Sequence, residues 1–313
     1  MESFGSGNVD CGNVTNSYNN NITMNNRTIT VNQTDEEDNE IKRWLSPLEP
    51  RYRHQSVQAN RVDGVGGWLL ESAEFREWSN SQAVPRQAVL FCYGDPGVGK
   101  THIRSVRTPS PTDGHQLTAR VVSSLVIDWL CDQIRNRDTA VSGLYCDYLA
   151  QKEQFTTSIL GAVLKQLLER DGIPESLRLV FHKEKRAFGG RTMQLLDLVG
   201  VLKATIASLP EVFICIDGLD ECLPNNRREI LEALQDIVRA SPTARVFLSG
   251  RPHIRDEVKK YFPEAIMVAV IPTIEDIERY LKMRLDRDPT PSAMDDNLRA
   301  EIMRVIPTKI SQM

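Results

Sequence analysis

The chain has 313 residues, of which 41% are hydrophobic and 26% are charged. This is the composition of an ordinary globular protein, and it excludes collagen, a coiled-coil fibre and a wholly disordered chain. The 38 basic and 42 acidic side chains give a formal net charge of −4 at pH 7. No overall positive field therefore recruits nucleic acid or an acidic membrane, and any bound anion must be held by a local site.

Cysteine usage and the N-terminus indicate the compartment. The six cysteines are scattered and include no C-x-x-C pair, which favours a reducing environment. The N-terminus lacks the basic and apolar regions of a secretory signal. No apolar run reaches the length of about 18 residues that suggests a transmembrane helix. We therefore expect a cytoplasmic protein without a membrane span.

Residues 1–40 differ in composition from the rest of the chain. They are rich in Asn, Thr, Ser and Gly and close with the acidic run Asp35–Asp38, so we predict a disordered tail without a packed core. Within the tail, Ile22–Asn32 alternates partly between apolar and polar residues and carries Asn side chains that can stack as ladders. This segment is either amyloid-prone or simply part of a solvated tail, and we favour the solvated tail.

The segment 41–85 is globular in composition and is expected to be a helical lead-in, with a helix over Val65–Trp78. Short apolar runs of strand length follow, with helical patterns between them. The runs are Ala88–Tyr93, Gly143–Tyr148, Val212–Ile216, Arg245–Ser249 and Ala265–Val270. Buried strands that alternate with helices predict an α/β fold with a five-stranded parallel sheet flanked by helices.

We assign this α/β core to residues 86–271. Beyond it, apolar residues at helical spacing predict a short C-terminal helical appendage over 272–313, including a helix over 293–305. We interpret the appendage as the truncated start of a helical domain.

The strongest functional pattern follows the first predicted strand directly. It consists of Gly94, Asp95, Pro96, Gly97, Val98, Gly99, Lys100 and Thr101, which fit the phosphate-binding loop G-x-x-x-x-G-K-[ST]. The glycines let backbone N–H groups surround the phosphates, Lys100 reaches the β and γ oxygens, and the Thr101 hydroxyl is a ligand for Mg²⁺. The pattern predicts that a nucleoside triphosphate binds here together with Mg²⁺.

A second pattern places acidic residues directly after the strand Val212–Ile216. Asp217 is expected to hold Mg²⁺ through water. Hydrolysis also needs a carboxylate that polarises the attacking water, and Glu221, or Asp220 near it, is the candidate.

The third pattern is Arg251, which follows a strand at the sheet edge where α/β proteins bind ligands. We expect its guanidinium to sense the γ-phosphate; the alternative is that its charge simply faces water. The histidines show no metal-like spacing and no serine or cysteine has a partnered base, so zinc and nucleophilic catalysis have no support. The [NT]-K-x-D segment that recognises guanine does not occur, which disfavours GTP.

At these three patterns the chain resembles the NACHT family of P-loop NTPases, in particular the fungal NOD-like receptors with a nephrocystin-type N-terminal ATPase domain. The marks are Phe91–Thr101, Gly218 directly after Asp217, and Ser249–Pro252. The resemblance, from about Trp44 onward, implies an ATPase core of the signal-transduction (STAND) class that exchanges ADP for ATP and self-associates on activation. In fungal relatives the receptor acts in non-self recognition and cell death, and some relatives carry amyloid-forming N-terminal segments that act on a downstream effector.

Two departures from the family pattern affect these expectations. The helix that should continue from Thr101 is interrupted by Arg104–Val122, whose Pro109, Pro111 and Gly114 cannot continue a helix. Removing this insert restores helical spacing, so we hypothesise a translated intron or a gene-model artefact. If the insert is real, nucleotide binding is weakened or lost. The alternative to an ATP-binding switch is a catalytically inactive adaptor that signals through its Asn-rich tail. The chain also shows no 33- or 40-residue repeat, which we interpret as truncation.

Overall fold

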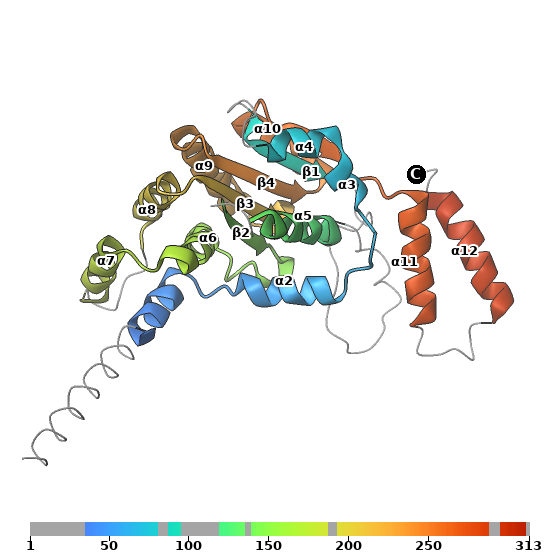
Figure 1. The fold of residues 1–313 in the computed structure, drawn as a ribbon, viewed down its shortest axis with the longest axis horizontal. Helices are drawn as coiled ribbons and strands as arrows, with labels where there is room; N and C mark the ends of the chain where they lie inside the picture. Colours follow the sequence, from blue (N-terminus) through green and yellow to red (C-terminus); the bar gives the residue numbers. More distant parts are fainter. Residues whose placement is uncertain are drawn as a thin grey trace, which may run out of the picture.

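Figure 1 shows the computed structural model, which describes residues 35–80, 87–94, 119–134, 139–186, 193–287 and 295–310. One all-parallel, five-stranded sheet has the order β2-β3-β4-β1-β5. The strands are β1 (Val89–Tyr93), β2 (Thr139–Tyr145), β3 (Glu211–Asp217), β4 (Ala244–Gly250) and β5 (Ile266–Ala269). The predicted α/β class and five-stranded parallel sheet are confirmed.

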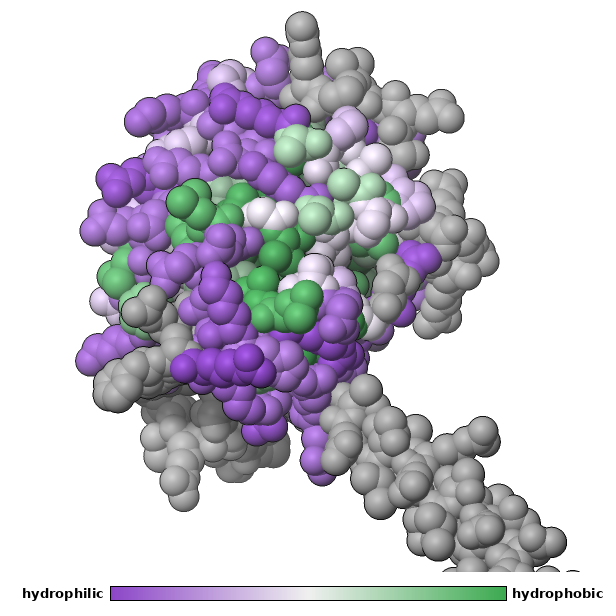
Figure 2. Space-filling model, turned by 90° about the vertical axis from the view of Figure 1, so that its left-hand side faces the viewer, coloured by the Kyte–Doolittle hydropathy of each residue, from purple (hydrophilic) through white to green (hydrophobic). Residues whose placement is uncertain are grey.

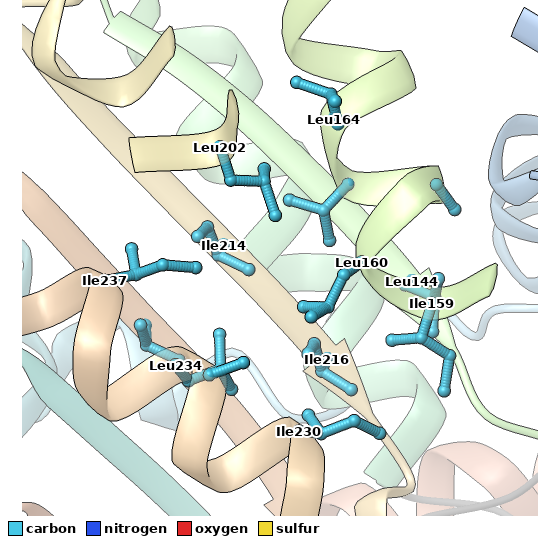
Figure 3. Packing of buried hydrophobic residues seen from close by; sticks show 14 of the residues in the cluster. Leu144, Ile159, Leu160, Leu164, Leu202, Ile214, Ile216, Ile230, Leu234 and Ile237 are labelled. Carbon is cyan, nitrogen blue, oxygen red and sulfur yellow. The ribbon is translucent and has the colours of Figure 1, made fainter. Parts of the chain in front are cut away.

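Helices cover both faces of the sheet. On one face α6 (Thr156–Asp171), α8 (Leu195–Ala207) and α9 (Pro224–Ala240) pack against the strands. Figure 3 shows Leu160 of α6, Leu202 of α8 and Leu234 of α9 around Ile214 and Ile216 of β3. This cluster also includes α7 (Glu175–Arg186) and α10 (Arg255–Tyr261).

The opposite face carries a second cluster formed by α2 (Pro50–Ala59), α3 (Trp68–Glu71), α4 (Ala73–Ser79) and α5 (Ala119–Ile134). Trp78 of α4 is fully buried, with its ring against those of Phe213 and Phe247. Successive β1 residues alternate between the two clusters, as the pleat of a strand requires. A sheet buried on both faces explains why its strands are continuous apolar runs.

A helix over residues 35–45 lies where the sequence places the end of the tail. Ile41 is fully buried, and Arg178 of α7 pairs with both Glu37 and Asp38. The carbonyl oxygen of Leu45 lies so close to α6 that a Cβ at Gly161 would approach it within 2.0 Å. The expected boundary at residue 40 thus falls inside a docked helix, because the acidic run finds basic partners on α7.

Two predicted elements differ in their limits. The lead-in helix is divided into α3 and α4 at Ser72, whose hydroxyl accepts the N–H of Phe75 as an N-cap and donates to the carbonyl of Leu69. Strand β2 begins and ends earlier than the run Gly143–Tyr148, because the Asp147 side chain caps the short 3₁₀ helix η3 (Tyr148–Ala150).

The C-terminal appendage consists of α11 (Ile274–Asp286) and α12 (Asp296–Ile310), which contact each other and lie beyond the sheet at the right of Figure 1. The carboxylate of Asp276 accepts the backbone N–H of Gly66, and Arg279 donates to the carbonyl of Gly64 over 2.8 Å. The appendage is therefore joined to the lead-in segment that precedes α3.

Figure 2 shows the end of the molecule that lies at the left of Figure 1, where apolar residues are exposed among polar ones. The helices α7 and α8 are at this end, and they contribute the exposed side chains of Leu179 and Leu196. Among the described residues, no helix has both the length and the apolar character needed to cross a membrane.

Candidate functional site

One residue of each sequence pattern, Gly94, Asp217 and Arg251, lies at the carboxyl edge of the sheet, where β4 lies between β1 and β3. The backbone N–H of Gly94, the first residue after β1, donates to the carbonyl of Gly250 at the end of β4 over 3.3 Å. Neighbouring strands are about 4.8 Å apart, so the ends of β1 and β3 are separated by roughly 10 Å. The start of the phosphate-loop pattern and Asp217 therefore flank the end of one strand.

Asp217 is the last residue of β3, and its side chain is almost completely buried. Its Oδ1 accepts the hydroxyl of Ser249 on β4 over 2.6 Å and the hydroxyl of Ser123 on α5. Two hydroxyl donors to one oxygen fix the orientation of the carboxylate.

Directly after Asp217 the chain turns at Gly218, which adopts the left-handed conformation (φ 70°, ψ 38°). Its backbone N–H donates to the Ser249 hydroxyl over 2.9 Å. Glycine adopts this conformation without the strain that a Cβ brings. The turn leads into the 3₁₀ helix η4 (Leu219–Glu221), which carries the two remaining acidic candidates.

Asp220 lies against Arg251, the expected phosphate sensor. Its Oδ1 accepts the backbone N–H of Arg251, and its Oδ2 pairs with the Arg251 Nε, each over 3.1 Å. The Asp220 side chain is only 7% exposed, whereas that of Arg251 is 43% exposed. Asp220 therefore holds Arg251 at the end of β4 rather than presenting its own carboxylate to solvent.

Glu221 is also buried, but it faces the segment after β2. Its Oε2 accepts the backbone N–H of Tyr148 over 3.0 Å, and its carbonyl accepts the side-chain amide of Gln151 over 2.7 Å. These bonds join η4 to η3. Of the two carboxylates that the sequence leaves as candidates for polarising water, Asp220 pairs with Arg251, whereas Glu221 accepts the Tyr148 N–H.

Two thiols complete this region. Cys146 follows β2 and Cys222 follows η4, and the hydrogen bond between them together with burial raises the pKa of Cys146 well above its usual value. The buried thiols Cys92 and Cys215 likewise have raised pKa values because burial disfavours the thiolate. Cys92, Cys146 and Cys215 are therefore thiols at neutral pH.

Gly94 is the one member of the phosphate-loop pattern among the described residues; Asp95–Thr101 lie outside them. The sequence reasoning missed Ser123 and Ser249 as partners of Asp217. Ser249 lies within the Ser249–Pro252 pattern, and Ser123 directly follows the insert. The alternation of strand residues could have found Ser249, because a serine in an otherwise apolar buried strand needs a hydrogen-bonding partner.

The donor set at Asp217 fits a hard divalent cation. A carboxylate with neighbouring hydroxyl oxygens is the chemistry that Mg²⁺ prefers, and Mg²⁺ usually completes its shell with water and substrate phosphates. The described residues include no group of three or more His, Cys, Asp or Glu side chains that could hold a metal by themselves.

Two solved structures have a general likeness to the chain. A structure of Drosophila ORC bound to DNA has a TM-score of 0.38 at 11% identity, covering 81% of this chain and 52% of that chain. The Walker-type ATPase of Pyrococcus abyssi has a TM-score of 0.38 at 14% identity, covering 77% of this chain and 65% of that chain. The chain thus spans less than two thirds of the length of either matched chain. No curated protein matches it significantly.

The family model described as Nephrocystin 3, N-terminal, matches residues 64–108 and 120–251. The match omits residues 109–119, which lie within the insert Arg104–Val122, and it includes the phosphate-loop pattern, Asp217 and Arg251. Because these residues make up more than half of the sequence, the chain belongs to the Nephrocystin 3 N-terminal family.

Proposed function

We propose that this chain is an ATP-binding switch of the fungal NOD-like receptor type, in which ATP or ADP bound with Mg²⁺ controls self-association. The observation that carries the proposal is the position of Gly94 and Asp217 on either side of the end of β4, each bonded to that strand. A separation of roughly 10 Å between the ends of β1 and β3 is one that a triphosphate and its metal can bridge. Non-self recognition or cell death is the setting that the family resemblance suggests.

Each residue has a distinct part in this proposal. The N–H groups of Gly94–Thr101 and the Lys100 ammonium bind the phosphates, while Thr101 and Asp217 hold Mg²⁺. When bound, Mg²⁺ neutralises developing charge on the transferred phosphoryl group. Glu221 orients the attacking water, and Arg251, held by Asp220, senses the γ-phosphate. A single carboxylate positioned by backbone contacts is consistent with slow hydrolysis, which suits a switch.

Titration of the purified chain with labelled ATP, with and without Mg²⁺, tests the proposal. We expect saturable, Mg²⁺-dependent binding that Lys100→Ala removes, that Asp217→Asn weakens, and that excess GTP does not compete away. Lys282→Ala, which changes an exposed lysine of α11, is the matched control and should bind like the wild type. Glu221→Gln should retain bound ATP while slowing its turnover. Binding that is absent, or that Lys100→Ala leaves intact, would defeat the proposal.

The second candidate function is an inactive adaptor that signals through the Asn-rich segment of residues 1–34. The observation that favours it is the insert Arg104–Val122, which separates Thr101 from the helix carrying Ser123. An adaptor should bind its effector equally well with and without ATP. Removing the first 34 residues should abolish that binding, whereas Lys100→Ala should not affect it.

A further inference from the structure

Two buried cysteines lie side by side at the carboxyl edge of the sheet. The Sγ atoms of Cys146 and Cys222 are 3.2 Å apart, and the two residues are 0% and 3% exposed. A disulfide requires about 2.05 Å between its sulfur atoms, so a closure of about 1 Å would join them. Of the five cysteines that the structure describes, these are the two with a hydrogen bond between their sulfurs, and none of the five is in a disulfide.

The backbone on both sides of the pair already holds the two sulfurs in place. The N–H of Cys146 donates to the carbonyl of Asp217 over 2.8 Å, and the N–H of Cys222 donates to the carbonyl of Leu219. The Tyr148 N–H, two residues after Cys146, donates to the side chain of Glu221. A covalent bond here therefore requires little rearrangement of either segment.

Both cysteines are buried, although residues close to each of them in sequence are exposed. Tyr148 and Leu149 of η3 are 68% and 61% exposed, and Leu223, next to Cys222, is 44% exposed. Each thiol thus lies within three residues of open surface. This favours a small uncharged oxidant over a bulky one such as a peptide disulfide.

We infer that Cys146 and Cys222 form a reversible disulfide when the protein meets a hydroperoxide, and that this bond fixes the η4 loop against the end of β2. Hydrogen peroxide oxidises one thiol to a sulfenic acid and releases one water. The second thiol then displaces the hydroxyl, which leaves with that thiol's proton as a second water while the S–S bond forms. Two thiols and one peroxide thus give one disulfide and two waters.

The consequence is that η4, which carries Asp220 and Glu221, is tied to β2 through a bond between positions 76 residues apart in sequence. Closing a long loop covalently stabilises a protein by restricting its unfolded state. The inference concerns the redox state of the loop, and it holds whether or not the chain binds a nucleotide.

Non-reducing peptide mapping of the full-length chain tests the inference. After brief treatment of the folded, reduced protein with hydrogen peroxide, free thiols are alkylated and the digest is analysed by mass spectrometry. We expect one cross-linked peptide pair containing Cys146 and Cys222, lost on treatment with dithiothreitol. The oxidised protein should melt about 5 °C or more above the reduced protein.

Three variants make the result specific. Cys146→Ala and Cys222→Ala should each remove the cross-link and the rise in melting temperature, and a dimedone adduct should then trap the sulfenic acid on the remaining cysteine. Cys215→Ala is the matched control, because it removes a thiol buried on the neighbouring strand β3 and should leave the cross-link intact. Oxidation of exposed Cys131 with no cross-link, a cross-link that forms only in urea, or an unchanged melting temperature in the cross-linked protein would each overturn the inference.

Discussion

The hydroxyl of Ser249 bridges the ends of two strands, donating to the Asp217 carboxylate over 2.6 Å and accepting the N–H of Gly218 over 2.9 Å. Through this one side chain the strand that precedes the sensor arginine fixes the carboxylate expected to hold Mg²⁺. The orientation of the carboxylate thus depends on β4 as well as on β3.

Ser249→Ala removes a single oxygen atom, but it should clearly destabilise the folded protein. It removes a hydrogen bond to a buried carboxylate and leaves the Gly218 N–H without its acceptor, so we expect a loss of about 2–3 kcal/mol in the free energy of unfolding. Urea denaturation measures this loss. Ser241→Ala is the control: Ser241 is also buried, but its hydroxyl has no hydrogen-bond partner among the described residues, so a change within about 0.5 kcal/mol is expected. Equal losses for the two variants would contradict the bridging role.

Gly218→Ala tests the turn after Asp217. At φ 70° a Cβ is strained, and the substitution should cost about 1–2 kcal/mol of stability, although its nearest contact would be an ordinary 3.4 Å. The matched change Gly200→Ala lies within α8, where a Cβ would meet nothing within 4 Å. Because alanine favours the helix, this control should stabilise the protein by about 0.5–1 kcal/mol. Thermal unfolding of the two variants should therefore shift in opposite directions, and a shift of the same sign would be inconsistent with the turn geometry.

Much of the fold could be predicted because buried parallel strands appear in the sequence as continuous apolar runs, such as Val212–Ile216. These runs can be recognised without knowledge of the tertiary structure. The polar contacts of the site were harder to predict from the sequence. Asp220 and Glu221 are adjacent in sequence, and no local pattern indicates that one lies against Arg251 and the other against Tyr148. Likewise, the limits of α2 within the predicted helical lead-in could not be predicted, because only Pro50 and Val57 of it are buried, which leaves no apolar stripe to detect.

The pairing of Asp220 with Arg251 predicts energetic coupling. Asp220→Asn keeps an oxygen for the Arg251 N–H but loses the ion pair, and Arg251→Gln loses the same pair from the other side. Because Arg251 is partly exposed, a double-mutant cycle should give a modest coupling energy of about 0.5–1 kcal/mol. The control cycle combines Arg251→Gln with Asp286→Asn on α11 and should be additive. Additivity in both cycles would mean that Asp220 does not hold the arginine.

The junction at Asp276 predicts a pH dependence of stability. Burial raises the pKa of Asp276 above its usual value near 3.8, so the folded protein holds this proton more tightly than the unfolded chain. Its contribution to stability is therefore complete below that value and is lost as the pH rises through the folded pKa. Relative to the wild type, Asp276→Asn should gain stability between about pH 4 and pH 7.

The neighbouring Glu275 provides a control, because its substitution should change the pH dependence of stability in the opposite direction. A backbone hydrogen bond at Glu275 and the Thr273 hydroxyl lower the pKa of this exposed side chain, so its contribution is present at neutral pH and lost as the pH falls. Glu275→Gln should therefore lose stability relative to the wild type over the same rise in pH. Urea midpoints measured across this range distinguish the two, and parallel curves would contradict the assignment at Asp276.

The insert yields the last prediction. The structure begins α5 at Ala119, so the last four residues of Arg104–Val122 are helical, and Val122 is buried beside Ser123. Deleting Arg104–Val122 would put Ile103 in the buried position of Val122 and Thr101 three residues before Ser123, one turn away on the same helix face. Because Ser123 already donates to Asp217, the Thr101 hydroxyl would then lie next to the carboxylate expected to share its Mg²⁺.

The deletion variant should therefore bind ATP in the presence of Mg²⁺ at least tenfold more tightly than the full chain, a gain of about 1.4 kcal/mol. Deleting the same segment together with Thr101→Val should remove the gain, since the hydroxyl is lost while the shape of the side chain is kept. A deletion of 109–119 alone, the stretch outside the family match, leaves Thr101 about three helical turns before Ser123 and should not restore it. Unfolding of the deletion variant, or equal ATP affinities in all three proteins, would show that α5 does not continue the phosphate loop.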